Sequence, residues 1–351
     1  MSIKIEIDGK ICNVNPGTTI SEAAEKAGIR IPGLCRADGI STRENHSSSC
    51  SVCMVKKTDD GTLVTACDSA IYEPVSILSS AGDKDIFNAR KQSLEMLLSE
   101  HIGDCEGPCV LSCPFGIDIP EILKFAWKGD MDKTAEILSG YAGKDSFPCT
   151  DCSAPCTKAC RRKQIDSPLD IKKIILDLYS KSGGEPGKKS NLPLKDKKGK
   201  FTCMTGRIKN EQEKLIFINS SLEKRYKAGK GSIQEAGKCL QCSCSSRLNC
   251  ELRDLADEYQ ARSGTFKTGP REDIPPASFH GALIFQHGKC IRCRRCERTA
   301  VKKEIEPVPR FWFRGKKARM NFGPDGYSKA DAAALASACP TGAITVNDYD
   351  F

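Results

Sequence analysis

The sequence predicts an α+β chain of several domains, and three observations lead to that prediction. The first residues, IKIEIDGKICNV, alternate apolar and polar side chains on both sides of Asp8-Gly9, which is typical of two antiparallel strands joined by a tight turn. Residues 86–180 instead contain amphipathic runs with helical spacing, such as PLDIKKIILDLYSK. The chain has 351 residues, long enough for two or three domains, and 21 of them are cysteine. We therefore expect several small domains organised around cysteine chemistry.

The cysteine content indicates bound metal rather than disulfides. The N-terminus, MSIKIEIDGK, does not have the pattern of a signal peptide, and no apolar stretch approaches the roughly 18 residues of a membrane span. We therefore expect a reducing, cytoplasmic location and no membrane span, with a disulfide-stapled secreted protein as the alternative. The formal net charge of +9 would suggest an anionic partner. Thiolate-ligated iron–sulfur clusters of roughly −2 each would offset that charge, so we expect no nucleic-acid partner.

Four cysteines near the N-terminus have the spacing of cluster ligands. Structural zinc usually draws on two compact pairs, whereas here one C-x2-C lies between two single cysteines. The segments "IRIPGLC", "CSVCMV" and "VTACDSAI" resemble the [2Fe–2S] domain of the large iron–sulfur subunit of complex I and of related hydrogenases and formate dehydrogenases. The resemblance implies a β-grasp [2Fe–2S] ferredoxin domain over residues 1–80, and we expect Cys12 to be a core thiol. The implied ligands are Cys35, Cys50, Cys53 and Cys67.

The next region begins with HIGDCEGPCVLSCP, in which a histidine and three cysteines recur at every fourth position. "CPFGIDIPEILKFAWKGDMDKTAEIL" and "FPCTDCSAPCTKACRR" resemble the N-terminal iron–sulfur domain shared by the glutamate synthase small subunit and dihydropyrimidine dehydrogenase. The resemblance implies a helical domain over residues 86–180 with two [4Fe–4S] clusters. By the sharing pattern of that family, one cluster is held by His101, Cys105, Cys109 and Cys160, and the other by Cys113, Cys149, Cys152 and Cys156.

His101 has two interpretations that the sequence leaves open. The two cysteine segments supply seven thiols, one fewer than two four-ligand clusters need, which favours the histidine as the eighth ligand. A neutral imidazole in place of a thiolate would raise the potential of that cluster. A lone histidine is otherwise a hydrogen-bond donor to a neighbouring group or a cation at a helix C-terminus.

Residues 181–230, beginning KSGGEPGKKSNLPLKDKKGK, are rich in glycine, proline and lysine and predict a solvated linker. Flavin- and nucleotide-binding domains begin at this place in the glutamate synthase relatives. They require a G-x-G-x-x-G at a strand–helix junction, and the sequence contains none. We therefore do not carry the flavin module over to this chain. Cys203 is expected to be a structural thiol.

The C-terminal region, residues 231–351, contains two further cysteine sets. "EAGKCLQCSC" resembles a segment of flavin-dependent iron–sulfur oxidoreductases; its set, Cys239, Cys242, Cys244 and Cys250, suits either [4Fe–4S] or zinc. "HGKCIRCRRCERTA" with the later "ASACPTGAITV" follows the bacterial ferredoxin pattern, in which three closely spaced cysteines and a distant Cys-Pro bind one [4Fe–4S] cluster. We expect a ferredoxin-like iron–sulfur domain here, with His287 as a loop residue. Its ligands would be Cys290, Cys293, Cys296 and Cys339.

These patterns predict an electron-transfer subunit. The sequence has no phosphate-binding loop, no H-E-x-x-H and no G-x-S-x-G, so we expect no catalytic site of its own. The expected cofactors are one [2Fe–2S] and three or four [4Fe–4S] clusters, with one zinc ion as the alternative at the Cys239 set. The expected setting is a cytoplasmic hetero-oligomer of anaerobic metabolism, with a flavoprotein subunit linked to NAD(P)H and a catalytic subunit of the hydrogenase, formate or aldehyde oxidoreductase type. Several clusters branching from one flavin would also suit electron bifurcation.

Two other functions compete with that prediction. A redox- or iron-sensing regulator that binds nucleic acid usually needs one cluster and a helix-turn-helix or an aromatic-rich face. Neither is visible, and aromatic residues make up only 6% of the chain. A zinc-stabilised scaffold is the second alternative. Iron and zinc content distinguishes it from the electron-transfer prediction.

Overall fold

The computed structural model describes residues 2–36, 49–103, 105–142, 147–164, 166–184, 231–247, 249–266, 275, 277–313 and 318–347. Cys203 and most of the expected linker, residues 185–230, lie outside the described residues. The chain divides into two compact units, one made of Met1–Ile102 with Leu248–Phe351 and the other of Gly103–Arg247. Residues 231–247 thus belong to the helical unit, whereas the cysteine patterns of the sequence place them with the C-terminal region.

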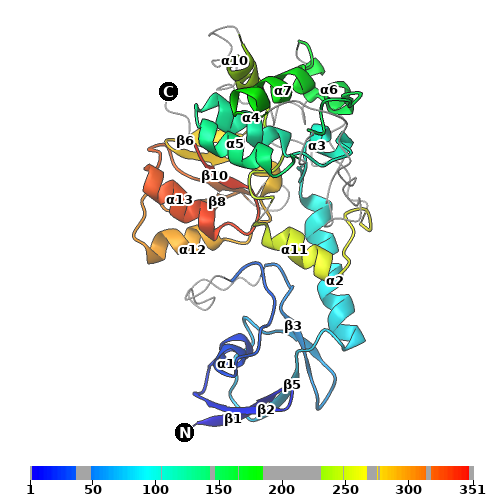
Figure 1. The fold of residues 1–351 in the computed structure, drawn as a ribbon. Coiled ribbons are helices and arrows are strands. Elements are labelled where there is room, and N and C mark those ends of the chain that lie inside the picture. Colours follow the sequence, from blue (N-terminus) through cyan, green and yellow to red (C-terminus); the bar gives the residue numbers. More distant parts are fainter. Residues whose placement is uncertain are drawn as a thin grey trace. The chain divides into compact units, whose positions relative to one another are not determined.

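The first unit begins with a five-stranded sheet in the order β2-β1-β5-β3-β4 (Figure 1). The strands are β1 (Ile3–Ile7), β2 (Lys10–Val14), β3 (Met54–Lys57), β4 (Leu63–Thr65) and β5 (Val75–Leu78). β1 and β5 are parallel and the other neighbours are antiparallel. The expected hairpin at Asp8-Gly9 is confirmed: both residues have positive φ, as a tight two-residue hairpin turn requires.

Helix α1 (Ile20–Lys26) lies between the first hairpin and the loop that carries Cys35. It starts with a capping box, in which the Glu22 backbone N–H donates to Thr19 Oγ1 and the Thr19 N–H donates to Glu22 Oε2. Ala23 and Ala24 are buried, so the helix turns its small face into the core. These bonds fix where the helix begins.

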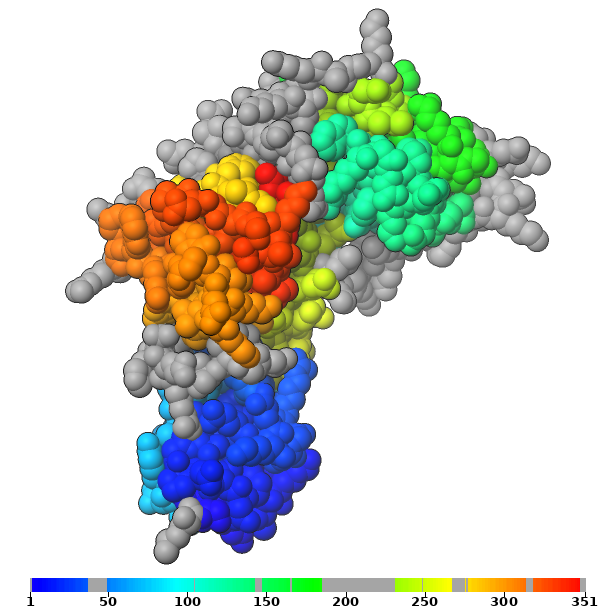
Figure 2. Space-filling model, turned by 90° about the vertical axis from the view of Figure 1, so that its left-hand side faces the viewer, coloured from blue at the N-terminus to red at the C-terminus, as the bar shows by residue number. Residues whose placement is uncertain are grey.

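Helix α2 (Lys84–Glu100) follows the sheet and packs against α11 (Glu251–Glu258) within the same unit. Arg90, which is fully buried, makes this connection. Its guanidinium donates to the Met54 carbonyl at 2.9 Å, the Ser79 carbonyl at 2.9 Å and the Tyr259 hydroxyl at 2.8 Å. Figure 2 shows the yellow segment around α11 against the blue N-terminal region. Charge-assisted bonds to three elements thus join the sheet to the rest of the unit.

The remainder of the first unit is a small α+β layer. A three-stranded sheet in the order β10-β7-β6 packs against α13, and a hairpin of β8 and β9 lies beside it. Its core contains Leu283, Phe285, Phe322 and Leu335, all buried. The elements are β6 (Ser278–His280), β7 (Leu283–Phe285), η4 (His287–Lys289), α12 (Arg295–Lys302), β8 (Arg310–Trp312), β9 (Arg319–Asn321), α13 (Lys329–Ala338) and β10 (Ile344–Val346).

The described residues of the second unit form helices without strands. Asp118, Asp130 and Asp170 accept hydrogen bonds from backbone amides at the starts of α4, α5 and α7. The helices are α3 (Pro108–Ser112), α4 (Ile119–Trp127), α5 (Met131–Ser139), α6 (Pro155–Ala159), η2 (Arg161–Gln164), α7 (Ile171–Lys181) and α10 (Ser232–Gly237). In neither unit do the described residues include a helix long and apolar enough to cross a membrane.

Candidate metal centres

Four buried cysteines converge beside the N-terminal sheet, on the loop after α1, the loop before β3 and the end of β4. They are Cys35, Cys50, Cys53 and Cys67. The sulfurs of Cys35 and Cys50 are 3.5 Å apart, and Cys53 is hydrogen-bonded to Cys67. Two thiolates on one tetrahedral metal with bonds of about 2.3 Å lie roughly 3.7 Å apart. The spacing of Cys35 and Cys50 therefore suits two ligands of one iron atom.

Hydrogen bonds among the same four sulfurs shift their pKa values. Hydrogen bonds from Cys50 and Cys67 lower the pKa of Cys35 to about 2, and a hydrogen bond from Cys67 lowers the pKa of Cys53. The pKa values of Cys50 and Cys67 rise, first because of their hydrogen bonds to Cys35. The Leu34 backbone N–H also donates to Cys50 Sγ at 3.4 Å. Without metal the site thus favours the thiolate at Cys35 and Cys53 and the thiol at Cys50 and Cys67, and metal binding would displace the remaining protons.

A second set of four cysteines consists of three that follow η4 closely in the sequence and one at the C-terminal end of α13. Its members are Cys290, Cys293, Cys296 and Cys339. Cys293 and Cys296 are buried, and their pKa values are raised by burial and by the charges of the other cysteines. Arg292 has a φ of 58° and its backbone N–H donates to Cys290 Sγ at 3.4 Å. The tight turn thus directs an amide at a sulfur, an interaction that tunes cluster potentials.

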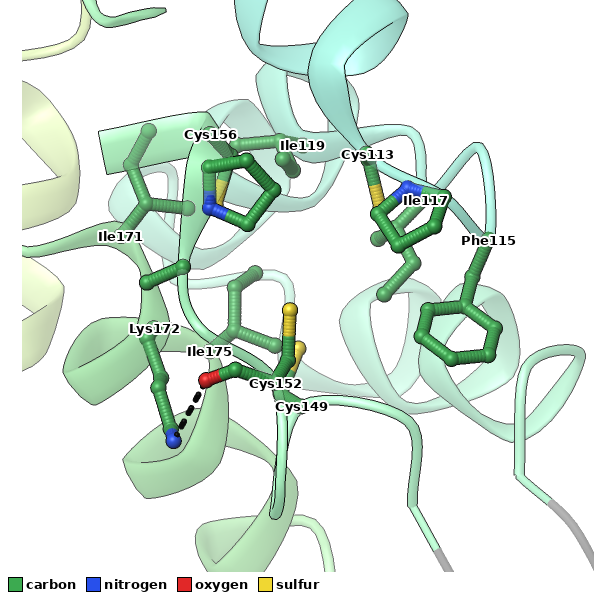
Figure 3. Close-up of a pocket in the computed structure, with 13 residues that line it drawn as sticks. Cys113, Phe115, Ile117, Ile119, Cys149, Cys152, Cys156, Ile171, Lys172 and Ile175 are labelled. Atoms are coloured by element: carbon green, nitrogen blue, oxygen red, sulfur yellow. Dashed lines mark hydrogen bonds between the residues drawn. The ribbon is translucent and has the colours of Figure 1, made fainter. Parts of the chain in front are cut away.

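In the second unit, four cysteines line one cavity between α3, α6 and α7 (Figure 3). They are Cys113, Cys149, Cys152 and Cys156. Figure 3 shows the Cys113 sulfur pointing toward those of Cys149 and Cys152, and Lys172 Nζ donates to the Cys152 carbonyl at 2.9 Å. Burial, followed by the charges of the neighbouring cysteines, raises the pKa of Cys149 to about 12 and that of Cys156 to about 11. The structure thus brings together four residues that the resemblance assigns to one cluster.

A second cavity of this unit is lined by a different set from the one expected. Cys109 and Cys160 are again neighbours, and they are joined by two residues from much later in the chain, Cys239 and Cys242. Burial raises the pKa of Cys109, and the next contributions come from Cys239, Cys242 and Cys160. This lining differs from the set implied by the resemblance because the segment after α10 folds back onto α3 and η2.

The other residues of the expected sets have different neighbours. The Cys105 carbonyl accepts a hydrogen bond from the Cys244 backbone N–H at 3.1 Å. In the first unit, Cys250 Sγ lies 3.7 Å from the Pro340 carbonyl. His101 is buried at the C-terminus of α2, with Nδ1 3.1 Å from the Lys289 carbonyl. A proton on Nδ1 leaves the lone pair on Nε2, so this bond suits either of the two roles that the sequence leaves open for the histidine.

Among the described residues, no group of three or more His, Cys, Asp or Glu side chains is compact enough to hold a single metal ion. In an iron–sulfur cluster the four thiolates are distributed over two or four iron atoms, so no single ion needs three of them. The donor chemistry of the N-terminal set and its N–H···S bond fit a [2Fe–2S] cluster, and those of the Cys290 set fit a [4Fe–4S] cluster.

Sequence reasoning did not single out Arg298. This arginine of α12 is 5% exposed, and its Nη2 donates to the carbonyls of both Cys35 and Cys293, the latter at 3.0 Å. Its Nε and Nη1 have no hydrogen-bond partner among the residues that the structure describes. Because an arginine two residues after a cysteine has no distinctive spacing, the sequence carried no signal for this role. Its charge lies where two ligand loops meet.

Residues 1–82 match the family model of the 2Fe-2S iron-sulfur cluster binding domain. The N-terminal part of the chain is therefore a [2Fe–2S] cluster-binding domain, and the resemblance found there in the sequence is confirmed.

Two hydrogenase subunits and a subunit of NADH-ubiquinone oxidoreductase are similar to about 30% of this chain. The NADP-reducing hydrogenase subunit HndD of Solidesulfovibrio fructosivorans is 34% identical over 105 residues, covering 29% of this chain and 17% of that protein. The NAD-reducing hydrogenase HoxS subunit gamma of Cupriavidus necator is 30% identical over 105 residues, covering 30% and 42%. The mitochondrial NADH-ubiquinone oxidoreductase 78 kDa subunit of Candida albicans is 28% identical over 103 residues, covering 29% and 14%. The chain thus spans less than half the length of each of these relatives.

The fold is also similar to that of a chain in the crystal structure of an NAD+-reducing [NiFe]-hydrogenase in the H2-reduced state. The TM-score is 0.50 and the sequence identity 15%, and the similarity covers 100% of this chain and 90% of that chain. At this identity the similarity concerns the fold alone.

Proposed function

We propose that this chain is an iron–sulfur electron-transfer subunit of an oxidoreductase complex, which relays electrons between a flavoprotein linked to NAD(P)H and a catalytic subunit. The observation that carries the proposal is Arg298, which hydrogen-bonds to the ligand loops of two cysteine sets at once. Both sets lie in the first unit.

The contact between these two loops supports a relay. Besides Arg298, the hydroxyl of Ser49 lies 3.4 Å from the Arg292 carbonyl, so each loop approaches the other at a second point. A buried guanidinium with two unpartnered nitrogens is costly unless negative charge lies nearby. Thiolate-ligated clusters on both sides would supply that charge. Two redox centres that share one cation and touch through their ligand loops are neighbours on an electron path.

The composition of the relay follows from the cysteine sets. We assign one [2Fe–2S] cluster to the Cys35 set and [4Fe–4S] clusters to the Cys113 and Cys290 sets. When bound, each cluster would supply one-electron chemistry. The chain provides the thiolates, the N–H donors to sulfur and the buried cations. Zinc in a scaffold would need the same thiols, and iron analysis distinguishes the two.

The relatives suggest the partners. Because they are named as NAD- or NADP-reducing hydrogenase subunits and a complex I subunit, a hetero-oligomer with a flavoprotein subunit is the expected setting. The catalytic partner would be of the hydrogenase, formate or aldehyde oxidoreductase type, in a cytoplasmic complex. Branching of electrons between clusters would suit bifurcation.

The test replaces Arg298 by glutamine in anaerobically purified protein, with Lys303→Gln as the control, an exposed cation just after the same helix. A nearby positive charge stabilises the reduced, more negative form of a cluster. Its loss should therefore lower the midpoint potentials of both the [2Fe–2S] and the Cys290 cluster in an EPR-monitored titration. Rapid freeze-quench should also show slower electron exchange between them. Potentials and exchange that match the control would contradict the relay.

A further inference from the structure

The cavity lined by Cys109, Cys160, Cys239 and Cys242 is enclosed by helices of one unit. Cys109 and Cys239 are buried, whereas Cys160 and Cys242 are partly exposed. Among the described residues that line the cavity, all others are apolar except for Arg161 and Arg162, and none is a carboxylate. Four cysteines line one cavity, and the charged side chains beside them are both arginines. Such an environment suits an anionic thiolate centre.

The segment that carries Cys239 and Cys242 is firmly attached to the helical unit. Helix α10 packs against α4 and α7, and a Cβ at Gly237 would collide with the Trp127 indole. Arg162 Nη1 donates to the Lys238 carbonyl at 2.7 Å, and Gln241 Nε2 donates to the Pro120 carbonyl at 2.9 Å. These contacts lie directly before and between the two cysteines, so their positions are fixed by several independent interactions.

Contacts beyond Cys242 secure the other end of the same segment. The Gly107 backbone N–H donates to Ser243 Oγ at 2.8 Å, next to the start of α3. Arg247 pairs with Asp118 and, at 2.9 Å, with Glu121 at the start of α4. The loop is therefore bound on both sides of the cysteine pair to the helices that carry and surround Cys109.

The turn from Cys239 to Cys242 has the same local geometry as the turn from Cys290 to Cys293. The third residue of each turn is left-handed, with a φ of 51° at Gln241 and 58° at Arg292. In each turn its backbone N–H donates to the first sulfur, at 3.5 Å and 3.4 Å. Non-glycine residues rarely adopt this conformation, so its repetition marks a shared requirement. In both turns this conformation directs a backbone amide at the sulfur of a candidate ligand.

We propose that Cys109, Cys160, Cys239 and Cys242 together bind a [4Fe–4S] cluster within residues 103–247. The ligands come from three segments, two single cysteines and one pair, rather than from the two compact pairs typical of structural zinc. The choice of iron over zinc rests on the proposed function, since it assumes an iron–sulfur chain; the ligand set itself does not. Each thiol gives up its proton as the cluster binds.

The test compares two double variants of the full chain, purified anaerobically. Cys109→Ala/Cys160→Ala and Cys239→Ala/Cys242→Ala remove the two halves of the proposed set. Each should lower the iron content by about four atoms per chain and abolish the same EPR signal of the reduced protein. Cys12→Ala, which removes a thiol of β2 in the other unit, should leave iron and spectra unchanged.

A third variant separates the proposal from the set implied by the glutamate synthase resemblance. Cys105→Ala should retain the signal that both double variants remove, because Cys105 does not line this cavity. Loss of that signal in Cys105→Ala, or loss of two different signals in the two double variants, would overturn the proposed set. Loss of one zinc ion instead of iron would overturn the cluster.

Misfolding is tested with Cys242→Ser, which keeps a possible oxygen ligand at a partly exposed position. It should retain the iron and shift only the signal in question; an unchanged spectrum would refute the role of Cys242. The outcome is independent of the relay, since a chain that binds this cluster but transfers no electrons between the Cys35 and Cys290 sets would still lose about four irons.

Discussion

The [2Fe–2S] set of the N-terminal domain and the Cys109 set of the helical unit reach four-cysteine sites by opposite routes. The first draws all its ligands from residues 35–67, around one sheet. The second draws on residues 109–242, with a long stretch of chain between its halves. Spacing along the sequence therefore identifies a site when its ligands share one loop and one strand. Spacing does not identify a site when its ligands come from distant segments that are brought together only by the packing of the fold.

Among the single substitutions that test this comparison, the largest effect is expected from Cys50→Ala, which removes a ligand from the local set. The chain should lose about two irons and its [2Fe–2S] signal, while the signals of the other clusters persist because their ligands lie elsewhere. Iron analysis with EPR of the reduced protein measures this. Concurrent loss of the Cys109 signal would show that the two sites are not separate.

Gly237→Ala should disturb the nonlocal set without touching a ligand. The added methyl group collides with Trp127, and overpacking of this kind typically costs about 1–3 kcal/mol. The loop that follows α10 should loosen and the signal of the Cys109 cluster should broaden or diminish, with the [2Fe–2S] signal as the internal reference. Gly264→Ala, at a glycine whose Cβ would meet nothing within 4 Å, is the matched control. Equal behaviour of the two variants would argue against docking of α10 as the element that positions the set.

Thr19→Ala should have the smallest effect, confined to the local set. It removes the capping box of α1, and losing such a cap costs about 1 kcal/mol. Thermal unfolding followed by circular dichroism should show lower stability than Thr62→Ala, at an exposed threonine. Because the loop with Cys35 is anchored elsewhere too, the [2Fe–2S] spectrum should stay unchanged. A change in that spectrum would mean that the cap positions the ligand loop.

The sequence was sufficient where structure is local. The hairpin at Asp8-Gly9 could be predicted because two left-handed residues between alternating strands have few other solutions. The [2Fe–2S] domain was recognised from three short segments within residues 1–82. The grouping of Cys239 and Cys242 with Cys109 could not be predicted in the same way. It depends on the packing of α10 against Trp127 and on single hydrogen bonds such as that from Arg162 to the Lys238 carbonyl.

Arg298 illustrates a second limit. Its role depends on two carbonyl groups that lie far apart in the sequence and meet only in the folded unit. Side-chain bonds to backbone carbonyls do not restrict the residue types of their partners, so no motif marks them. Such residues can be identified only in the folded structure, and Arg298 connects two sites that the sequence itself indicates.

The most direct test of the central account is the iron and zinc content of the full chain, isolated anaerobically. One [2Fe–2S] cluster and [4Fe–4S] clusters at the Cys113, Cys109 and Cys290 sets require about fourteen irons per chain. The account predicts at least that number with negligible zinc. About two irons, accompanied by stoichiometric zinc, would contradict the iron–sulfur relay and leave a zinc-stabilised scaffold attached to a [2Fe–2S] domain.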